Sequence, residues 1–351
     1  MIMMNKTLLV CTILLVLTGS SCKEIYTPKL DNESGLLVVD GKINDQAGPY
    51  TVHLYRSAAL YSSNYTEETG AQVYVNGDPG EYYYFTEKSP GNYYSDSTFR
   101  TQYYHSYNLE IFSGGNHYES TWQAIYPSNK LNTITAFLKT SSAIGNPTGI
   151  TNLKGVEFLA LLNTQNDFSP YYRFDNTLLI EYTTQSGTTN SYCWLSYNPN
   201  ETFNLSTENT SVSSLEQVLG FCPVDTSFYG INMTAGPPLT FRYLSAFKFT
   251  IRQYHINADV YKYYQSINNQ LAAKQQILDP AIYQCIGNIT CLSNPEEPVL
   301  GAFEASSVNT YSFYYTPQNI PVNINDRVPI DSIGPLNVTS SNCSAVPPDF
   351  W

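Results

Sequence analysis

Short stretches in which apolar and polar residues alternate recur along the chain from Leu36 onward. Such alternation, bounded by Gly, Pro, Asn and Asp, is typical of β-strands with one buried face. Turn residues at 76–80 predict a hairpin within 71–85. Turns recur about every 8–12 residues, which is the spacing of an immunoglobulin-like sandwich, so we predict one over residues 35–128. The strands that we expect there are 36–43, 50–56, 71–85, 91–96, 107–112 and 117–125.

Pro127 and the two polar residues after it indicate a boundary, and residues 129–351 predict a second β-rich domain. Its apolar positions change to helical spacing at Val260, Tyr264, Ile267 and Leu271, so we predict a helix near 258–273. The strands that we expect are 133–138, 155–163, 178–185, 247–254, 299–308 and 310–316.

A second, short helix is expected from Ser214 to Leu219, because Gln217 stands where a capping box needs it. The fold class that we predict is all-β, with two β-sandwich (immunoglobulin-like) domains. The second domain carries one docked α-helix.

Residues 1–21 have the pattern of an export signal. Lys6 precedes the apolar run 8–17, which is too short to span a bilayer. Small residues then lead to Cys22, so we predict cleavage before Cys22 and acylation of its thiol. Gly19 stands where such signals more often have Leu, and the alternative is an ordinary signal peptide with an incidental Cys. Residues 22–34 would form a short tether.

The residues after the predicted cleavage site bear on where the protein is displayed. Lys23 and Glu24 resemble the surface-export signal of Bacteroidota lipoproteins, which more fully has two acidic residues. We therefore expect an outer-membrane protein at the cell surface, with display in the periplasm as the alternative. No later stretch reaches the ~18 apolar residues of a spanning helix, so the lipid would be the only anchor.

Composition narrows the class of partner. Only 13% of the residues are charged, whereas 14% are aromatic, including 31 Tyr. Disordered chains are poor in aromatic residues, so we expect a folded protein. The formal net charge of −12 argues against nucleic acid as a partner, because nucleic-acid binding needs a basic surface.

Cysteine usage predicts one or two disulfides in an oxidising compartment. Cys11 leaves with the signal and Cys22 carries the lipid, which leaves five cysteines. A turn at Gly287 could bring Cys285 and Cys291 together, and Cys193 could pair with Cys222 or with Cys343. One thiol would stay free. No CxxC pair occurs and the histidines are scattered, so we expect no metal site.

Catalytic motifs are missing from the sequence. The histidines form no HExxH pattern or close pair, so we interpret them as structural or surface residues: His53, His105, His117 and His255. No GxSxG turn and no Gly-rich phosphate loop after a strand is present. Acidic residues are plentiful enough to leave a glycosidase-type pair open. We expect neither a cofactor nor enzymatic activity.

Adjacent tyrosines are the most informative feature. Neighbouring residues of a strand point to opposite faces, so burial explains only one ring of each pair. The outer rings could pair across strands, or they could line a contact surface that stacks on sugars or peptides. In the helix, we expect Tyr264 in the core and Tyr263 beside it. The runs in question are 82–84, 93–94, 103–104, 171–172 and 314–315.

Several segments, in this order along the chain, resemble the Bacteroidota lipoproteins of domain-of-unknown-function family four-two-four-nine. The segments are 38–41, 70–75, 90–95, 107–111, 171–174, 250–264, Gly287-Asn288, 296–308 and 348–351. The chain departs from the family in the Cys at position 285 and in its C-terminal end, which keeps Cys343 but lacks a second nearby Cys and a Gly pair. These departures affect the disulfide assignment and leave the resemblance intact.

The resemblance implies an outer-membrane lipoprotein, often encoded beside a TonB-dependent receptor, and it implies no known reaction. We therefore expect a non-catalytic surface lipoprotein that is accessory to a TonB-dependent transporter in nutrient capture or uptake. The alternative is a free-standing adhesin or a glycan or peptide binder.

Overall fold

The computed structural model describes residues 35–58, 64–128, 131, 133–144, 150–163, 171–186, 189–197, 203–207, 214–223, 241–272, 285–315 and 346. The predicted signal and tether, Cys22 and Cys343 lie outside these residues. The described chain is predominantly β, as the sequence predicted. Its one helix, α2 (Ala258–Ala272), lies where the spacing of Val260 and Tyr264 placed it, and both side chains are buried.

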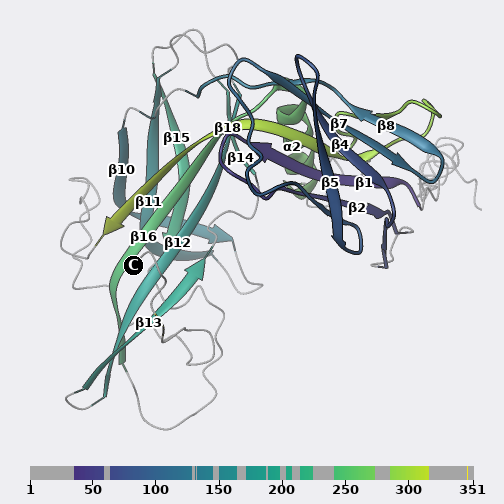
Figure 1. Cartoon of the computed structure of the whole chain (residues 1–351). Coiled ribbons are helices and arrows are strands. Elements are labelled where there is room, and N and C mark those ends of the chain that lie inside the picture. The colour runs from purple at the N-terminus through teal and green to yellow at the C-terminus, as the bar shows by residue number, and fades with distance from the viewer. Residues whose placement is uncertain are drawn as a thin grey trace, which may run out of the picture.

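The N-terminal strands form one part of a large sheet (Figure 1). Strand β5 pairs with both β6 and β4, and the sheet folds over there, so that both halves contribute to one core. Val39, Leu54, Val75 and Leu109 meet in this core almost without exposure. The strands are β1 (Leu37–Asn44), β2 (Thr51–Arg56), β3 (Thr66–Glu67), β4 (Gln72–Gly77), β5 (Glu81–Ser89), β6 (Asn92–Tyr94), β7 (Ser106–Ser113), β8 (Asn116–Ser120) and β9 (Gln123–Ala124).

The later strands extend this sheet and add a second one. The order β13-β12-β16-β18 continues from β1, whereas β10-β11-β15 is a separate three-stranded sheet. The two sheets face each other where Phe158 of β11 stacks on Phe249 of β16, with 3.7 Å between the ring centroids. The strands are β10 (Thr133–Ile144), β11 (Ile150–Asn163), β12 (Tyr171–Ser186), β13 (Thr189–Tyr197), β14 (Asn204–Thr207), β15 (Ser214–Pro223), β16 (Phe241–His255), β17 (Ile289–Cys291) and β18 (Leu300–Tyr315).

One prediction in this region is wrong. The segment that begins at Ser214 is the strand β15, and it pairs antiparallel with β11 instead of forming a helix. The capping pattern of Ser214 and Gln217 offers a helix only a local hydrogen bond. The ladder with β11 satisfies the backbone along the whole segment.

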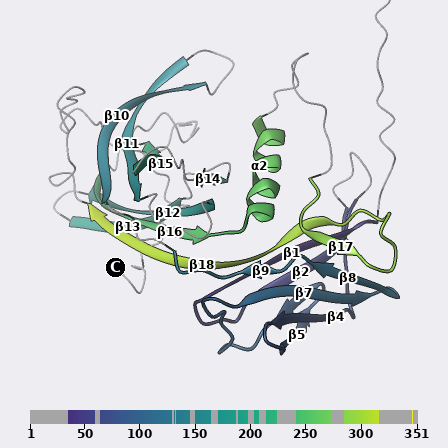
Figure 2. The same cartoon turned by 90° about the horizontal axis from the view of Figure 1, so that it is seen from above.

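The long strand β18 joins the two parts of the molecule (Figure 2). Leu300–Ser306 pair in parallel with β1, and Ser307–Tyr315 pair antiparallel with β16. The sequence suggested two strands here, and the structure has one. Strand β17 also returns to the N-terminal sheet, where it pairs with β8. The N-terminal sheet therefore extends beyond residues 35–128 and includes strands from the C-terminal third of the chain.

Asp45 provides a hydrogen-bond acceptor for the backbone at the point where β18 changes its partner strand. Its carboxylate accepts the backbone N–H of Val308 at 2.9 Å and the hydroxyl of Tyr103 at 2.6 Å. Nearby, the hydroxyl of Ser307 donates to the carbonyl of Tyr126 at 2.7 Å. The bond from Val308 replaces the ladder partner that its N–H lacks at the strand junction, and the other two bonds hold Tyr103 and Tyr126 beside it.

The start of β18 is crowded by backbone. Gly301 has φ +85°, and a Cβ there would lie 1.9 Å from the carbonyl oxygen of Val39. A Cβ on Gly287 would lie 1.7 Å from the carbonyl oxygen of Gly301. The amide of Asn288 then bonds both the N–H and the C=O of Phe303, each at 2.9 Å, as a neighbouring strand would.

A buried ion pair connects β12, β18 and α2. The guanidinium of Arg173 donates two hydrogen bonds to Glu304, at 2.9 and 3.0 Å, and the hydroxyl of Tyr264 donates to the same carboxylate at 2.7 Å. Burial alone would raise the pKa of Glu304. The charge of Arg173 and the hydrogen bonds outweigh burial, so the pKa lies below its ordinary value.

We expect Gly301→Ala to lower the free energy of unfolding by more than about 3 kcal/mol, because the methyl group has no space beside Val39. Gly35→Ala is the control. Gly35 has φ +84° but nothing within 4 Å of an added Cβ, so only the left-handed backbone costs energy, about 1–2 kcal/mol. Denaturant titration measures both, and equal losses would contradict the crowding.

We expect Arg173→Met to lower the free energy of unfolding by about 3–5 kcal/mol, because it leaves the buried carboxylate of Glu304 without its ion-pair partner, and Glu304→Gln to cost less, because Arg173 keeps its ion pair with Asp175 at 2.6 Å. The double variant Arg173→Met/Glu304→Leu should lower the free energy of unfolding by much less than the sum of the losses in the two single variants. Because the pKa of Glu304 is lowered, its contribution to stability is full above the ordinary pKa of a glutamate, about 4.3, and is lost as the pH falls through the lowered pKa. Denaturant titration at pH 7 and in a series of more acidic buffers checks this, and additive losses in the double variant would contradict it.

Candidate ligand-binding face

The outer surface of the N-terminal sheet carries exposed aromatic rings. In β5, Tyr82 and Tyr84 are 74% and 53% exposed, whereas Tyr83 and Phe85 point to the core. The prediction that only one ring of a tyrosine pair is buried is thus confirmed here. It is also confirmed at 93–94 and 171–172, and in α2, where Tyr264 is buried and Tyr263 is partly exposed.

The pair Tyr103 and Tyr104 departs from this rule. Both rings are exposed, at 45% and 68%. These residues lie in a turn instead of a strand, and Tyr104 has φ 66°. The alternation of faces therefore does not apply to them.

Strand register brings the exposed rings of β5, β4 and β7 together with a histidine of β8. Tyr84 lies opposite Tyr74, and Phe112 lies opposite His117. The ring centroids are 5.3 Å apart for Tyr74 and Tyr84, 6.4 Å for Tyr74 and Phe112, and 4.3 Å for Phe112 and His117. Aromatic side chains thus cross four adjacent strands.

Two carboxylates lie in the same row as the tyrosines. Tyr74 is opposite Glu110, and Glu110 is opposite Glu119, so the row across the sheet reads Tyr84, Tyr74, Glu110, Glu119. We call this surface the aromatic–acidic face. It comprises Tyr74, Asn76, Tyr82, Tyr84, Asn108, Glu110, Phe112, His117 and Glu119.

Side-chain amides and the imidazole hold the two carboxylates. The amide nitrogen of Asn76 donates to Glu110 at 3.2 Å, and His117 Nε2 lies 2.8 Å from the other oxygen of Glu110. The amide nitrogen of Asn108 donates to Glu119 at 2.5 Å. The amide oxygens of Asn76 and Asn108 are buried and have no hydrogen-bond partner. The acceptors that the face itself presents are the two partly exposed carboxylates.

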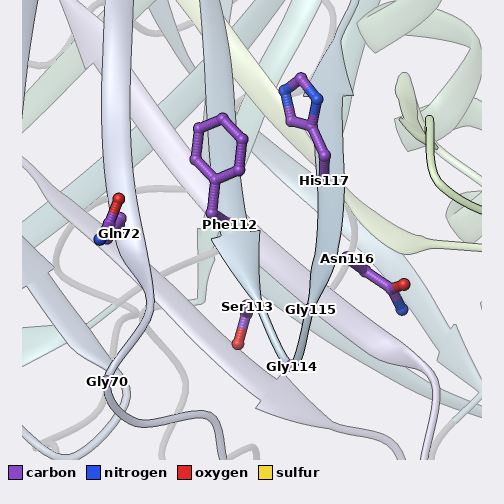
Figure 3. Close-up of a pocket in the computed structure, with 8 residues that line it drawn as sticks. All are labelled: Gly70, Gln72, Phe112, Ser113, Gly114, Gly115, Asn116 and His117. Carbon is purple, nitrogen blue, oxygen red and sulfur yellow. The ribbon is translucent and has the colours of Figure 1, made fainter.

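A hollow of about 320 Å³ adjoins this face at the tip of the β7–β8 hairpin (Figure 3). Gln72, Phe112 and His117 reach it from three adjacent strands. Gly114 and Gly115, with φ 57° and 83°, form the tight turn beneath it. A side chain or sugar ring bound on the face can extend into this hollow.

A smaller hollow of about 150 Å³ lies between α2 and β1. Asp40 and Lys42 form an ion pair at its edge, with 2.8 Å between Oδ1 and Nζ. Burial, together with the charge of Asp40, raises the pKa of Tyr263 in its wall to about 12. Its volume suits only a small group.

The family of the chain is shown by a match over most of its length. The model of the family described as domain of unknown function (DUF4249) matches residues 23–312. The chain belongs to the DUF4249 family. No curated protein and no solved structure matches it.

The cysteines of this DUF4249 protein fall into three groups. Cys285 and Cys291 are both free, so the disulfide suggested between them is not formed. The reason is their position: Cys291 is buried in the core of the N-terminal sheet, whereas Cys285 lies beside Tyr263 of α2. Cys193 and Cys222 belong to strands of different sheets, β13 and β15, and their pairing stays a prediction. Cys11, Cys22 and Cys343 lie outside the described residues.

The histidines of the DUF4249 protein all have local partners. His53 and His117 contact Glu67 and Glu110 at 2.7 and 2.8 Å, and His105 and His255 contact backbone carbonyls. Within the described residues, no group of His, Cys, Asp and Glu is arranged to hold a metal ion. In that part of the chain, no helix combines the length and apolar character needed to cross a bilayer.

The opposed glutamates are the part of the face that sequence reasoning did not single out. The signal was present in the turn at Gly114 and Gly115. A two-residue hairpin turn fixes the register on both sides, and this register sets Glu110 opposite Glu119 and Phe112 opposite His117.

We expect a tyrosine-selective nitrating reagent to modify Tyr82 and Tyr84 well before Tyr83, because Tyr83 packs against the core and its hydroxyl donates to Glu81 at 2.7 Å. Burial and Glu81 also raise the pKa of Tyr83, which disfavours the reactive phenolate. Peptide mass spectrometry after brief treatment measures the order. Equal modification of all three would contradict the assigned orientation of β5.

Proposed function

We propose that this DUF4249 protein is a non-catalytic outer-membrane surface lipoprotein that binds a ligand on the aromatic–acidic face. It serves as an accessory to a TonB-dependent transporter in nutrient capture or uptake. Three features support the proposal: the lipoprotein pattern that ends at Cys22, the low charge and high tyrosine content, and the exposed face.

The exposure of the rings is the observation that carries the binding role. Cross-strand pairing of Tyr74 with Tyr84 stabilises the sheet, but it leaves the ring of Tyr84 half exposed and Tyr82 almost wholly so. Aromatic side chains that stay exposed beside polar acceptors are typical of surfaces that bind sugars or peptides. The neighbouring hollow adds a concave boundary to this surface.

We further propose that the two parts of the molecule are related to immunoglobulin-like sandwiches. The N-terminal sheet folds over a single core, and Phe158 and Phe249 join two facing sheets in the second part. In the N-terminal part, short antiparallel strands joined by tight turns also support this interpretation.

The second candidate is a free-standing surface binder that needs no transporter. One observation favours it: all residues of the aromatic–acidic face come from β4, β5, β7 and β8 of a single chain. Such a face can bind a ligand without any contribution from a partner.

We expect the tagged full-length protein, extracted in mild detergent from its native outer membrane, to bring down a TonB-dependent barrel in stoichiometric amount. Mass spectrometry of the eluate identifies it. Recovery of the acylated lipoprotein alone would contradict the accessory role and favour the free-standing binder.

The binding role has a separate test in the same preparation. Tyr82→Ala/Tyr84→Ala should abolish retention of the ligand that co-purifies or is found by screening glycans and peptides, with the barrel still bound. Tyr65→Ala removes a ring of similar exposure, 54%, outside the face and should change nothing. Equal ligand retention by both variants would remove the face from the proposal.

A further inference from the structure

The two opposed glutamates define what kind of ligand the aromatic–acidic face accepts. Like charges directly opposite each other in a sheet are destabilising. Even so, no lysine or arginine of the described residues forms an ion pair with Glu110 or Glu119. His117, Asn76 and Asn108 hold the pair with hydrogen bonds. Within the described residues, the only basic side chain in contact with the pair is therefore His117, which contacts Glu110, and Glu119 forms no ion pair there.

Around the two glutamates, some hydrogen-bonding groups have partners and others have none. The amide nitrogens of Asn76 and Asn108 already donate to the glutamates, whereas both amide oxygens lack a partner. Asn108 is fully buried, so its unpartnered oxygen carries a real energetic cost. Because these oxygens are buried, the acceptors that the surface offers to a ligand are the partly exposed carboxylates of Glu110 and Glu119, which suit a ligand that donates hydrogen bonds.

The two tyrosines of the row also favour a positively charged ligand. The faces of Tyr74 and Tyr84 attract cations through the ring quadrupole. The cation–π contacts within the described residues involve Tyr94, Tyr254 and Tyr264, and none involves a ring of this face. Rings and carboxylates thus offer two neighbouring sites to a positive charge from outside the chain.

We infer that the aromatic–acidic face binds a basic peptide, with one Lys or Arg side chain over the tyrosines and a second between Glu110 and Glu119. This rests on the proposed binding function of the face. The two positions are two strand spacings apart, about 10 Å, which an extended peptide spans in about three residues. An ammonium or guanidinium group has only donors, as the face requires. A single small amine cannot reach both positions.

The test uses the full-length protein in detergent and labelled octapeptides in which Ser alternates with Lys, Gln or Glu. Fluorescence anisotropy should show binding of the Lys peptide only, weakened by added salt. Glu110→Gln and Glu119→Gln should each lower its affinity roughly fivefold, as an exposed charge pair is worth up to about 1 kcal/mol. Glu296→Gln removes the same charge at an exposed site off the face and should leave the affinity within about twofold.

Thermal unfolding of each variant shows that it is folded before its affinity is compared. Equal affinity for the Lys and Gln peptides, or an unchanged Lys affinity in Glu110→Gln and Glu119→Gln, would overturn the inference. Tighter binding of a glucosamine tetramer, lost in the same variants, would show that the positively charged ligand is an amino sugar. It would overturn the inference that the ligand is a basic peptide.

Binding of a neutral glycan that depends on Tyr84 but not on the glutamates would also overturn this inference, while the proposed binding function would stand. If the face binds nothing, and Tyr82→Ala/Tyr84→Ala has no effect on any ligand, then both this inference and the proposed binding function are wrong.

Discussion

A single strand, β18, pairs with both parts of the molecule, and the rest of the structure depends on that double pairing. Its first seven residues complete the N-terminal sheet beside β1, and its remainder completes the second part beside β16. The aromatic–acidic face lies on the outer surface of the first sheet, whose inner core includes Phe303 of β18. The core beneath that face is therefore completed by a strand that also belongs to the other half.

The change of partner in β18 exposes backbone groups that a regular ladder would satisfy, and specific side chains compensate for each of them. Asp45 accepts the N–H of Val308, and Asn288 bonds both polar groups of Phe303. The buried carboxylate of Glu304 is matched by Arg173 and Tyr264. Directional hydrogen bonds of polar side chains thus fix the junction.

Local features of this chain could be predicted from sequence, and long-range pairing could not. The alternation of apolar and polar residues predicted most strands and the opposite orientations of neighbouring rings in the run from Tyr82 to Tyr84. Helical spacing of apolar residues predicted α2. Nothing local indicates that β18 lies beside β1, and the polar Asn309 looked like a break between two strands. At Ser214, pairing with β11 overrode a capping pattern. The opposed glutamates of the face were encoded by the hairpin turn.

The parallel pairing of β1 with β18 also constrains the order in which the protein is made and folded. The hydrogen bond between Asp45 and Val308 joins residues 263 positions apart in the chain. Contacts of such high sequence separation form slowly, because a long loop must close first. Until β18 arrives, β1 is an edge strand with an unpaired backbone. The chain has to be protected from aggregation through almost the whole of its synthesis.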